Sequence, residues 1–401
     1  MTVRVNKPSF NLREKLSELT QSIGLKGREL MRAVTAQDAR DFVSAGRKNI
    51  IINGDFRIAQ RGTSSNSMAG SIYATVDRFF SYTANTNGTV TQTQDNDTPF
   101  GIGYSFKFES SSTGSPTNTS YYGIQQRIEG NHCADAIVYG STVSFWVKSN
   151  RSGFFPVAVF QSDSSNVTTR YSTQAYVDGN GTWQYITKYI PPGPAANNPR
   201  NSNAASYYLD ISMQAGSTYA FTSGQLNNWV QSGSVAGPNF GLCESNGNYI
   251  QFAMIQVEVG KNATEFEYRP IGEELALCQR YFQTTNTLLT EASPNFGETA
   301  YTGWQYQSDA GSLRIRLPVE MRTTPTAAII GTPSGSPGAS GTIGAYGNLG
   351  WMPLSSISIG DVTPLSVRVN CSGLTGSGKD AFGLYFYGTY QNSTITLNAE
   401  L

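Results

Sequence analysis

The sequence predicts a mainly β protein with a short helical N-terminal segment, a β-sandwich, a linking helix and a second, smaller β-sandwich. Three observations lead to this prediction. Charged residues make up 14% of the chain, well below the ~25% of ordinary soluble domains. Gly (41 residues), Tyr (22) and Phe (20) are abundant instead, a mixture typical of short strands and tight turns. A chain of 401 residues is also too long for one ordinary core, so we expect more than one domain.

Residues 1–48 have the pattern of short helices. Asn11 stands three residues before Glu14, which is the spacing of a capping box. The leucines that follow recur at near-helical intervals, at Leu12, Leu16 and Leu19. Helices of this length are marginal alone in water, so they need a surface to pack on. We interpret the segment as an attachment device, and the alternative is a helical cover on the following domain.

The same segment is basic, whereas the rest of the chain is acidic. It carries ten Lys and Arg against five Asp and Glu, a net charge of +5, which leaves −5 for the rest of the neutral chain. Arg13 and Lys15 could therefore pair with an acidic groove on a partner. A solvated helical face explains the charges equally well.

From residue 49 the pattern changes to strands, which we assign to a domain over 49–270. The segment Asn49-Ile-Ile-Ile-Asn-Gly-Asp-Phe56 predicts a strand that ends in a turn. Further strands are expected at 77–82, 104–108, 143–147, 157–161, 182–190, 207–213 and 249–259. Several alternate between apolar and polar residues, which indicates an antiparallel two-sheet sandwich.

The stretch 271–285 predicts a linking helix, because Glu273–Phe282 contains only good or neutral helix formers. A second β domain is expected over 286–401. Its predicted strands lie at 301–306, 312–317, 326–330, 366–369 and 381–388, and the Gly, Ser and Pro of 331–350 predict a long loop.

Several motifs resemble a known family. Asn53-Gly-Asp-Phe56, Ile255-Gln-Val-Glu-Val-Gly260 and Thr264-Glu-Phe-Glu-Tyr-Arg269 resemble the jelly-roll module of carbohydrate-binding-type domains, in which the opening and closing strands pair. With the continuation through Phe282, the chain resembles tail-fibre and appendage proteins of tailed bacteriophages. The opening residues 3–16 are similar to leader segments of virion proteins from marine and cyanobacterial phages.

This resemblance implies a jelly-roll β-sandwich in a virion component that is made in the host cytoplasm. The component would be a homotrimeric fibre that attaches to other virion proteins through residues 1–48. The resemblance also implies a structural calcium near the opening strand, for which Asp55 would be the local ligand. The alternative is an Asp that holds its own turn.

Composition and motifs argue against several other classes of function. The single histidine, His132, lies in an expected loop, and no nucleophile elbow, zinc motif or phosphate loop is present. We therefore predict no enzyme. A zero net charge argues against nucleic-acid binding, and no apolar run approaches the ~20 residues of a membrane span.

Aromatic residues suggest glycan binding instead, because sugars stack on aromatic faces and bond to amides and carboxylates. Trp229, between Asn227, Asn228 and further polar residues, is the leading candidate, followed by Tyr207 and Tyr121. For each aromatic ring, a place in the core is the competing interpretation.

The sequence thus predicts a phage tail fibre or tail-associated appendage that binds a host surface glycan. One alternative is a head fibre, capsid decoration or tail adaptor without a receptor. A second is a polysaccharide depolymerase, which would need two suitably spaced carboxylates.

Overall fold

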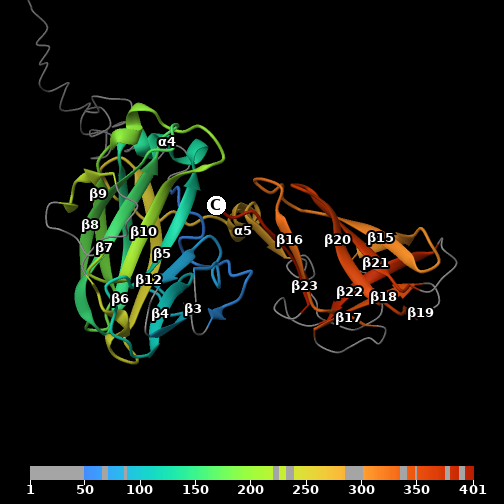
Figure 1. Ribbon diagram of the computed structural model, residues 1–401. Coiled ribbons are helices and arrows are strands. Elements are labelled where there is room, and N and C mark those ends of the chain that lie inside the picture. Colours follow the sequence, from blue (N-terminus) through green and yellow to red (C-terminus); the bar gives the residue numbers. More distant parts are fainter. Residues whose placement is uncertain are drawn as a thin grey trace, which may run out of the picture.

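The computed structural model describes residues 49–65, 71–84, 88–219, 225–231, 239–284, 301–334, 341–347, 350–374, 380–387 and 393–401. The predicted attachment segment, with Arg13, Lys15, Leu12, Leu16 and Leu19, lies outside these residues. The described part is mainly β, as predicted, with two α-helices, α4 (Gly130–Tyr139) and α5 (Ile271–Gln279). In Figure 1 two β bodies stand side by side with α5 between them. Neither of these helices has the length and apolar character needed to cross a membrane.

The first body is a sandwich of two six-stranded antiparallel sheets. The β12 sheet has the order β1-β3-β4-β12-β6-β9, with bounds Ser64–Ser65, Thr89–Asp95, Ser105–Ser112, Tyr249–Val259, Ser141–Ser149 and Gln184–Ile190. The β10 sheet has the order β11-β8-β7-β10-β5-β2, with bounds Trp229–Val230, Thr168–Asp178, Ser152–Ser162, Ala205–Ala215, Tyr121–Glu129 and Phe80–Ala84. Two 3₁₀ turns, η1 (Pro194–Asn197) and η3 (Leu242–Glu244), lie in its connections.

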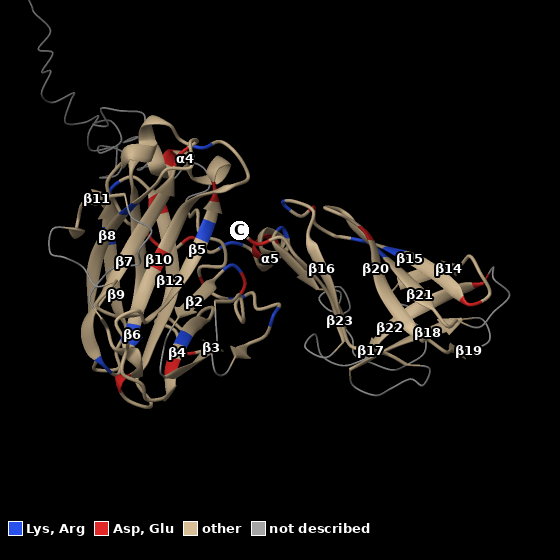
Figure 2. Cartoon of the chain, viewed as in Figure 1, with Lys and Arg blue, Asp and Glu red and all other residues tan. Residues whose placement is uncertain are grey.

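Alternate residues of these strands build one core between the two sheets, as a period of two requires. Phe145 of β6, Leu209 of β10 and Phe252 of β12 are among its buried members. Helix α4 contributes Cys133 to the same core. His132, expected in a loop, instead lies exposed on α4, because the helix turns its other face to the core. Figure 2 shows how few charged residues interrupt the strands of either body.

The second body pairs a large sheet with a small one. The large sheet has the order β17-β18-β22-β14-β15-β21-β20, with bounds Thr332–Pro333, Thr342–Gly347, Ala381–Tyr387, Tyr301–Gln305, Ala310–Arg316, Ser366–Ser372 and Ser356–Thr363, and β19 (Gly350–Met352) pairs with β18. The small sheet has the order β13-β23-β16, with bounds Phe282–Thr284, Thr394–Asn398 and Thr326–Ile330. Leu313, Val369 and Leu397 belong to the shared core. The loop predicted for 331–350 is wrong in part, since β17 and β18 form a parallel pair there.

The predicted opening strand over 49–56 is also wrong. The segment follows β12 through the bonds from Ile50 N to Val257 O (3.0 Å) and from Ile255 N to Gly54 O (2.9 Å), yet it forms no regular ladder. Asn53 and Phe56 have φ angles of 61° and 57°, and this left-handed conformation ends any extended strand. The expected pairing of the opening and closing segments is therefore present as contacts rather than as two strands.

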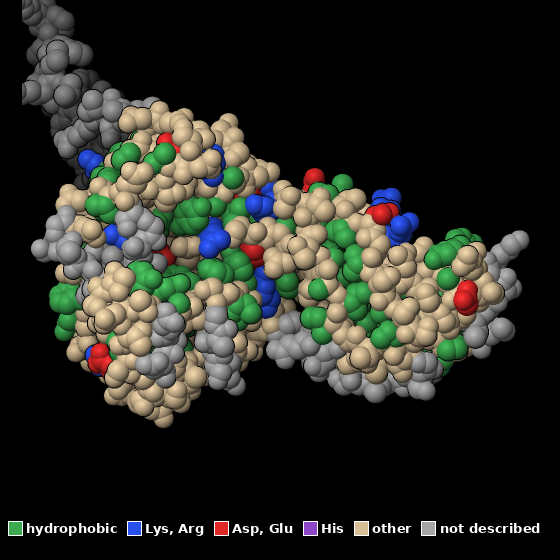
Figure 3. Space-filling view, in the orientation of Figure 1, with side chains coloured by type: hydrophobic (Ala, Val, Ile, Leu, Met, Phe, Trp, Pro, Cys, Tyr) green, Lys and Arg blue, Asp and Glu red, His purple; other side chains and the backbone are tan. Residues whose placement is uncertain are grey.

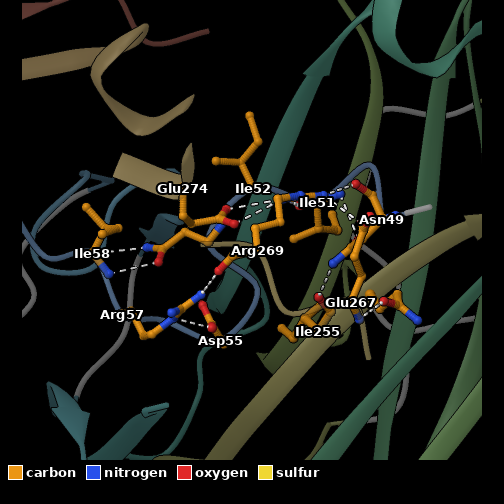
Figure 4. A network of polar contacts seen from close by, with 12 residues as sticks. Asn49, Ile51, Ile52, Asp55, Arg57, Ile58, Ile255, Glu267, Arg269 and Glu274 are labelled. Atoms are coloured by element: carbon orange, nitrogen blue, oxygen red, sulfur yellow. Dashed lines mark hydrogen bonds and ion pairs between the residues drawn. The ribbon is translucent and has the colours of Figure 1, made fainter. Parts of the chain in front are cut away.

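Buried side chains satisfy the main chain of this opening segment (Figure 4). Arg269 donates to the carbonyl of Ile51 at 3.0 Å and to that of Asn49. The carboxylate of Glu274, in α5, lies 3.2 Å from the Arg269 guanidinium and accepts from the amide of Asn53. Because all of these groups are buried, each would be left unsatisfied without its partner.

A second polar cluster joins the two bodies. Glu400, just after β23, forms ion pairs with Arg61 (3.1 Å) and Arg78 of the first body. The two guanidinium groups lie over the rings of Phe282 (3.6 Å) and Tyr281 (3.4 Å), respectively. Ion pairs and cation–π contacts between buried groups thus connect the two bodies.

We expect Arg269→Ala to lower the free energy of unfolding by about 3–5 kcal/mol, because it leaves the Glu274 carboxylate buried without its counter-charge. Chemical denaturation of the whole chain measures this. Arg316→Ala, at an exposed position of β15, is the control and should change stability by less than about 0.5 kcal/mol. Equal effects of the two substitutions would contradict the role given to Arg269.

Candidate functional site

The outer side of the β10 sheet combines polar, charged and aromatic side chains. In β10, the residues that point into the core are Tyr207, Leu209, Ile211 and Met213. The alternate residues Tyr208, Asp210 and Ser212 therefore point to the outer side of the β10 sheet. Strand register places Asp210 opposite Ala158 of β7 and Gln125 of β5. We call this surface the outer β10 face.

The outer β10 face has small residues at its centre and large ones around them. The small residues are Gly123, Pro156, Ala158, Ser172 and Ser212. The large ones are Phe80, Tyr82, Tyr121, Arg127, Phe154, Phe160, Arg170, Tyr176 and Tyr208. Since side-chain length sets the height of a sheet surface, this arrangement makes a hollow, and Figure 3 shows the first body hollowed in its middle with hydrophobic atoms at the bottom. The hollow extends over four strands and three rows of outward side chains, which corresponds to roughly 14 Å by 13 Å.

Asp210 occupies the floor of this hollow. Its Oδ1 accepts a hydrogen bond from the hydroxyl of Tyr82 (2.7 Å) and its Oδ2 accepts one from Nε2 of Gln125 (3.2 Å). Gly123 makes the first bond possible, because a Cβ at that position would lie 2.1 Å from the Tyr82 hydroxyl. Burial raises the pKa of Asp210 to about 7, although Tyr82 and Gln125 act in the opposite direction. In the ionised carboxylate these two bonds occupy one acceptor site on each oxygen, so each oxygen keeps a further site.

Arg127 forms one wall of the hollow. Its Nε donates to Oε1 of Gln125 at 2.7 Å, and its guanidinium lies over the ring of Phe80 at 4.7 Å. Its Nη1 donates to the main-chain oxygen of Leu401 at 2.7 Å, so the last residues of the second body help to orient it. On the opposite wall, burial lowers the pKa of Arg170, whose Nη2 donates to Gln225 at 3.4 Å.

An exposed aromatic pair stands at one end of the face. Phe154 of β7 and Tyr176 of β8 are 47% and 43% exposed, and their ring centroids are 4.9 Å apart. Rings of this size are usually covered in a folded protein. Here they offer apolar surface beside the polar floor, as a sugar-binding surface requires.

The aromatic residues predicted from the sequence are dispersed. Tyr121 lies on the outer β10 face, where its ring is 5.8 Å from that of Tyr82. Tyr207 is fully buried and shares a hydrogen bond of 2.8 Å with Ser141, so the expectation of a ligand-facing ring is wrong. It failed because neighbouring tyrosines in one strand point to opposite faces, and Tyr208 is the outward member.

Trp229 lies at the sheet edge rather than on an open platform. Its ring is 5.5 Å from that of Tyr171 and covers Gly193, where a Cβ would lie 2.5 Å from the indole. This half-buried position corrects the expectation of an exposed platform. Asn227 and Asn228 are exposed beside it. The main-chain N–H of Asn227 donates to the carbonyl of Ser172 in β8, which places Asn227 at the border of the outer β10 face.

Sequence reasoning missed Asp210, Arg127 and Gln125. A signal for the first was present, because Asp210 is the acidic residue in the middle of an otherwise alternating apolar strand. Arg127 and Gln125 carried no comparable signal, since polar outward residues are ordinary in antiparallel sheets.

Asp55, the expected calcium ligand, pairs with Arg57 in the framework of Figure 4. Burial raises the pKa of its carboxyl. Within the ranges given above, no group of three or more His, Cys, Asp and Glu residues is arranged to hold a metal ion. Asp55 therefore has an ion-pair partner in Arg57, and calcium binding at this position stays a prediction.

No protein-family model matches the chain, and no curated protein matches it. The solved structures to which part of this chain is similar include a family 11 carbohydrate-binding module from Clostridium thermocellum. Its identity is 12%, the match covers 52% of this chain and 99% of that chain, and the TM-score is 0.27. Another is a putative sugar binding protein from Bacteroides thetaiotaomicron, with 14% identity, 53% and 100% coverage and a TM-score of 0.31.

A third is the enzymatically active domain of tailspike protein 4 from bacteriophage CBA120, with 12% identity and a TM-score of 0.28. The match covers 53% of this chain and only 21% of the tailspike chain. Similarities of this size transfer no function, so the function is argued from the geometry of the outer β10 face.

We expect the carboxyl of Asp210 to make stability depend on pH. Its pKa is higher in the folded state than in the unfolded chain, so the folded state binds more protons and the free energy of unfolding falls as pH rises from about 4 to about 7. Asp210→Asn removes this contribution, and the stability difference between the two proteins should change by about 2–4 kcal/mol over that range. Denaturation curves at pH 4, 5.5, 7 and 8 measure it.

Burial also raises the pKa of Asp77, to about 6. Asp77 therefore makes the free energy of unfolding fall with rising pH in both the wild type and the Asp210→Asn variant. The comparison between the two proteins therefore isolates Asp210. Parallel stability curves would show that Asp210 does not titrate in this window.

Proposed function

We propose that this chain is a carbohydrate-binding protein and that the outer β10 face holds the sugar. The observation that carries the proposal is the buried carboxyl of Asp210 at the floor of a hollow with aromatic walls. Burying a carboxyl on the outside of a sheet costs free energy unless it is satisfied. Tyr82 and Gln125 satisfy one acceptor site on each oxygen, and a ligand hydroxyl would satisfy another.

The proposed binding chemistry divides between two kinds of contact. Asp210 accepts hydrogen bonds from sugar hydroxyls, and the Arg127 guanidinium donates one to a ring or hydroxyl oxygen. The faces of Phe154 and Tyr176 cover the C–H surface of a neighbouring sugar ring. A pyranose has both apolar faces and a polar rim, so a hollow with these two linings fits it. Charged ligands are not required at this site.

We further propose binding without catalysis, in a bacteriophage particle. The phage setting is supported by the resemblance of residues 3–16 to virion leader segments and by the continuation of the jelly-roll motifs through Phe282. In this setting residues 1–48 attach the chain to other virion proteins, and three copies in a tail fibre or tail-associated appendage present their glycan sites together. Several weak sites on one particle give strong overall attachment.

The test of the binding site is a comparison of two tyrosines with similar exposure. Tyr176→Ala should weaken binding to the best neutral oligosaccharide from a glycan array by roughly 3- to 10-fold, because a stacked ring contributes about 0.5–1.5 kcal/mol beyond area. Tyr185→Ala, 46% exposed on the opposite sheet, should leave affinity unchanged. Isothermal calorimetry measures both variants.

Loss of oligosaccharide binding in Tyr185→Ala, with binding retained in Tyr176→Ala, would indicate that the site lies on the β12 sheet. Absence of any glycan binding would favour a purely structural virion part. Release of reducing ends from the bound polysaccharide would favour a depolymerase.

Attachment has its own test. Replacing Arg13 and Lys15 by Glu reverses two charges of the basic segment, so the variant should associate less with the bacteriophage particles. Circular dichroism should show that its β bodies remain folded. Co-purification with particles at wild-type occupancy would defeat the proposal. Replacing Lys188 and Lys261 of the β domain by Glu gives a control with the same change of net charge.

A further inference from the structure

A second surface with different chemistry lies on the other body. In β15 and β21, Leu313 and Val369 point into the core, so Arg314, Arg316 and Arg368 point to the outer side of the large sheet. Register places Arg314 directly opposite Arg368. We call the outer surface formed by these three arginines, with Trp304 and Asn370, the arginine face, and Figure 2 shows the blue of β15 beside the red of β20.

The gathering of these arginines is not a result of a basic domain. After residue 285 the chain has five Lys and Arg (Arg314, Arg316, Arg322, Arg368 and Lys379) against seven Asp and Glu. Three of the five basic residues nevertheless share one face. Like charges directly opposite on neighbouring strands are destabilising, so the sheet keeps this arrangement at the expense of stability.

Asp361 of β20 reduces the repulsion without removing it. Its carboxylate lies 3.2 Å from Arg368 and 3.8 Å from Arg314, so one negative charge faces two positive ones, and Arg316 follows two residues farther along β15. All of these side chains are substantially exposed, Arg314 at 50% and Asp361 at 60%. Gly360 leaves space for Arg368, since a Cβ there would lie 2.8 Å from its Nε.

Next to the arginines stands an exposed indole. Trp304 of β14 is 63% exposed and pairs with Ser312, which in turn pairs with Asn370. Ser312 is two residues before Arg314 on β15, so the indole lies one row of side chains from the guanidinium groups. A stacking surface, an amide and excess positive charge are thus combined on one open sheet face.

We propose that the arginine face binds an acidic polysaccharide, one whose sugar rings carry carboxylate or sulfate groups. Planar guanidinium groups pair with such anions in a fork geometry, and Trp304 would stack on a ring between them. A polysaccharide fits better than a nucleic acid, because a local excess of about two charges on a neutral chain is too small for the basic footprint of nucleic-acid binding. The inference goes beyond the proposed function and does not depend on the outer β10 face.

Binding of the whole chain to polygalacturonate and to heparin tests this proposal, with amylose as the neutral polymer and a 20-base-pair DNA duplex as the competing polyanion. Affinity electrophoresis at NaCl concentrations from 20 to 300 mM should show binding to at least one acidic polysaccharide that weakens with salt. The double variant Arg314→Glu, Arg368→Glu should bind it at least tenfold more weakly. The double variant Lys188→Glu, Lys261→Glu has the same change of net charge and should bind like the wild type.

Two single substitutions sharpen the test. Asp361→Asn removes the carboxylate that faces the arginines, so it should tighten binding two- to fivefold, an outcome that loss of folding cannot mimic. Trp304→Ala should weaken binding, whereas Tyr185→Ala, at a residue of the first body that is 46% exposed, should not.

The proposal is overturned if neither acidic polysaccharide binds, if amylose or the DNA duplex binds as tightly, or if the Arg314 and Arg368 charge reversals leave affinity unchanged. Loss of oligosaccharide binding in Tyr176→Ala with polyanion binding retained would show that the two sites are separate. Loss of polyanion binding in the arginine variants, with oligosaccharide binding retained, would show the same.

Discussion

The first body depends on hydrogen bonds that side chains make to a buried, irregular stretch of its main chain. Residues 50–58 enter the core without joining a sheet ladder, so their amides and carbonyls require side-chain partners. Arg269 and Glu274, which lie more than 200 residues later in the sequence, are partners for several of these groups. Gln126 of β5 makes two further hydrogen bonds, both of 2.8 Å, to the main chain of Ile52. Because Gln126 precedes Arg127, this satisfied segment also fixes the strand that carries the wall of the candidate sugar site.

The same principle connects the two bodies to the site. Glu400 is buried between Arg61 and Arg78, and Arg78 also donates to the carbonyl of Arg127 at 2.6 Å. Leu401 then accepts from the Arg127 side chain. The second body is therefore a structural support for one wall of the outer β10 face, and its docking limits the positions that the Arg127 guanidinium can take.

Strands rich in β-branched and aromatic residues could be predicted, and β12 and β16 have the predicted ends. The segment 49–56 could not, because a continuous apolar run suits a strand or a buried loop, and only the tertiary partners of Asn53 decide between them. Tyr207 and Tyr208 show a second limit. Both are aromatic, so local alternation does not reveal which one faces the core, whereas the parity set by Leu209 and Asp210 does.

The two proposed surfaces differ in what they can recognise. The outer β10 face is a hollow with one buried carboxyl, so it suits neutral rings and hydroxyls, whose binding should depend little on salt. The arginine face is open and charged, so its attraction for an anionic polymer acts over about one Debye length, ~8–10 Å, and weakens with salt. The Glu400 cluster joins the two bodies that carry these surfaces. Because the two surfaces favour ligands of different charge, the salt dependence of binding distinguishes them in the intact chain.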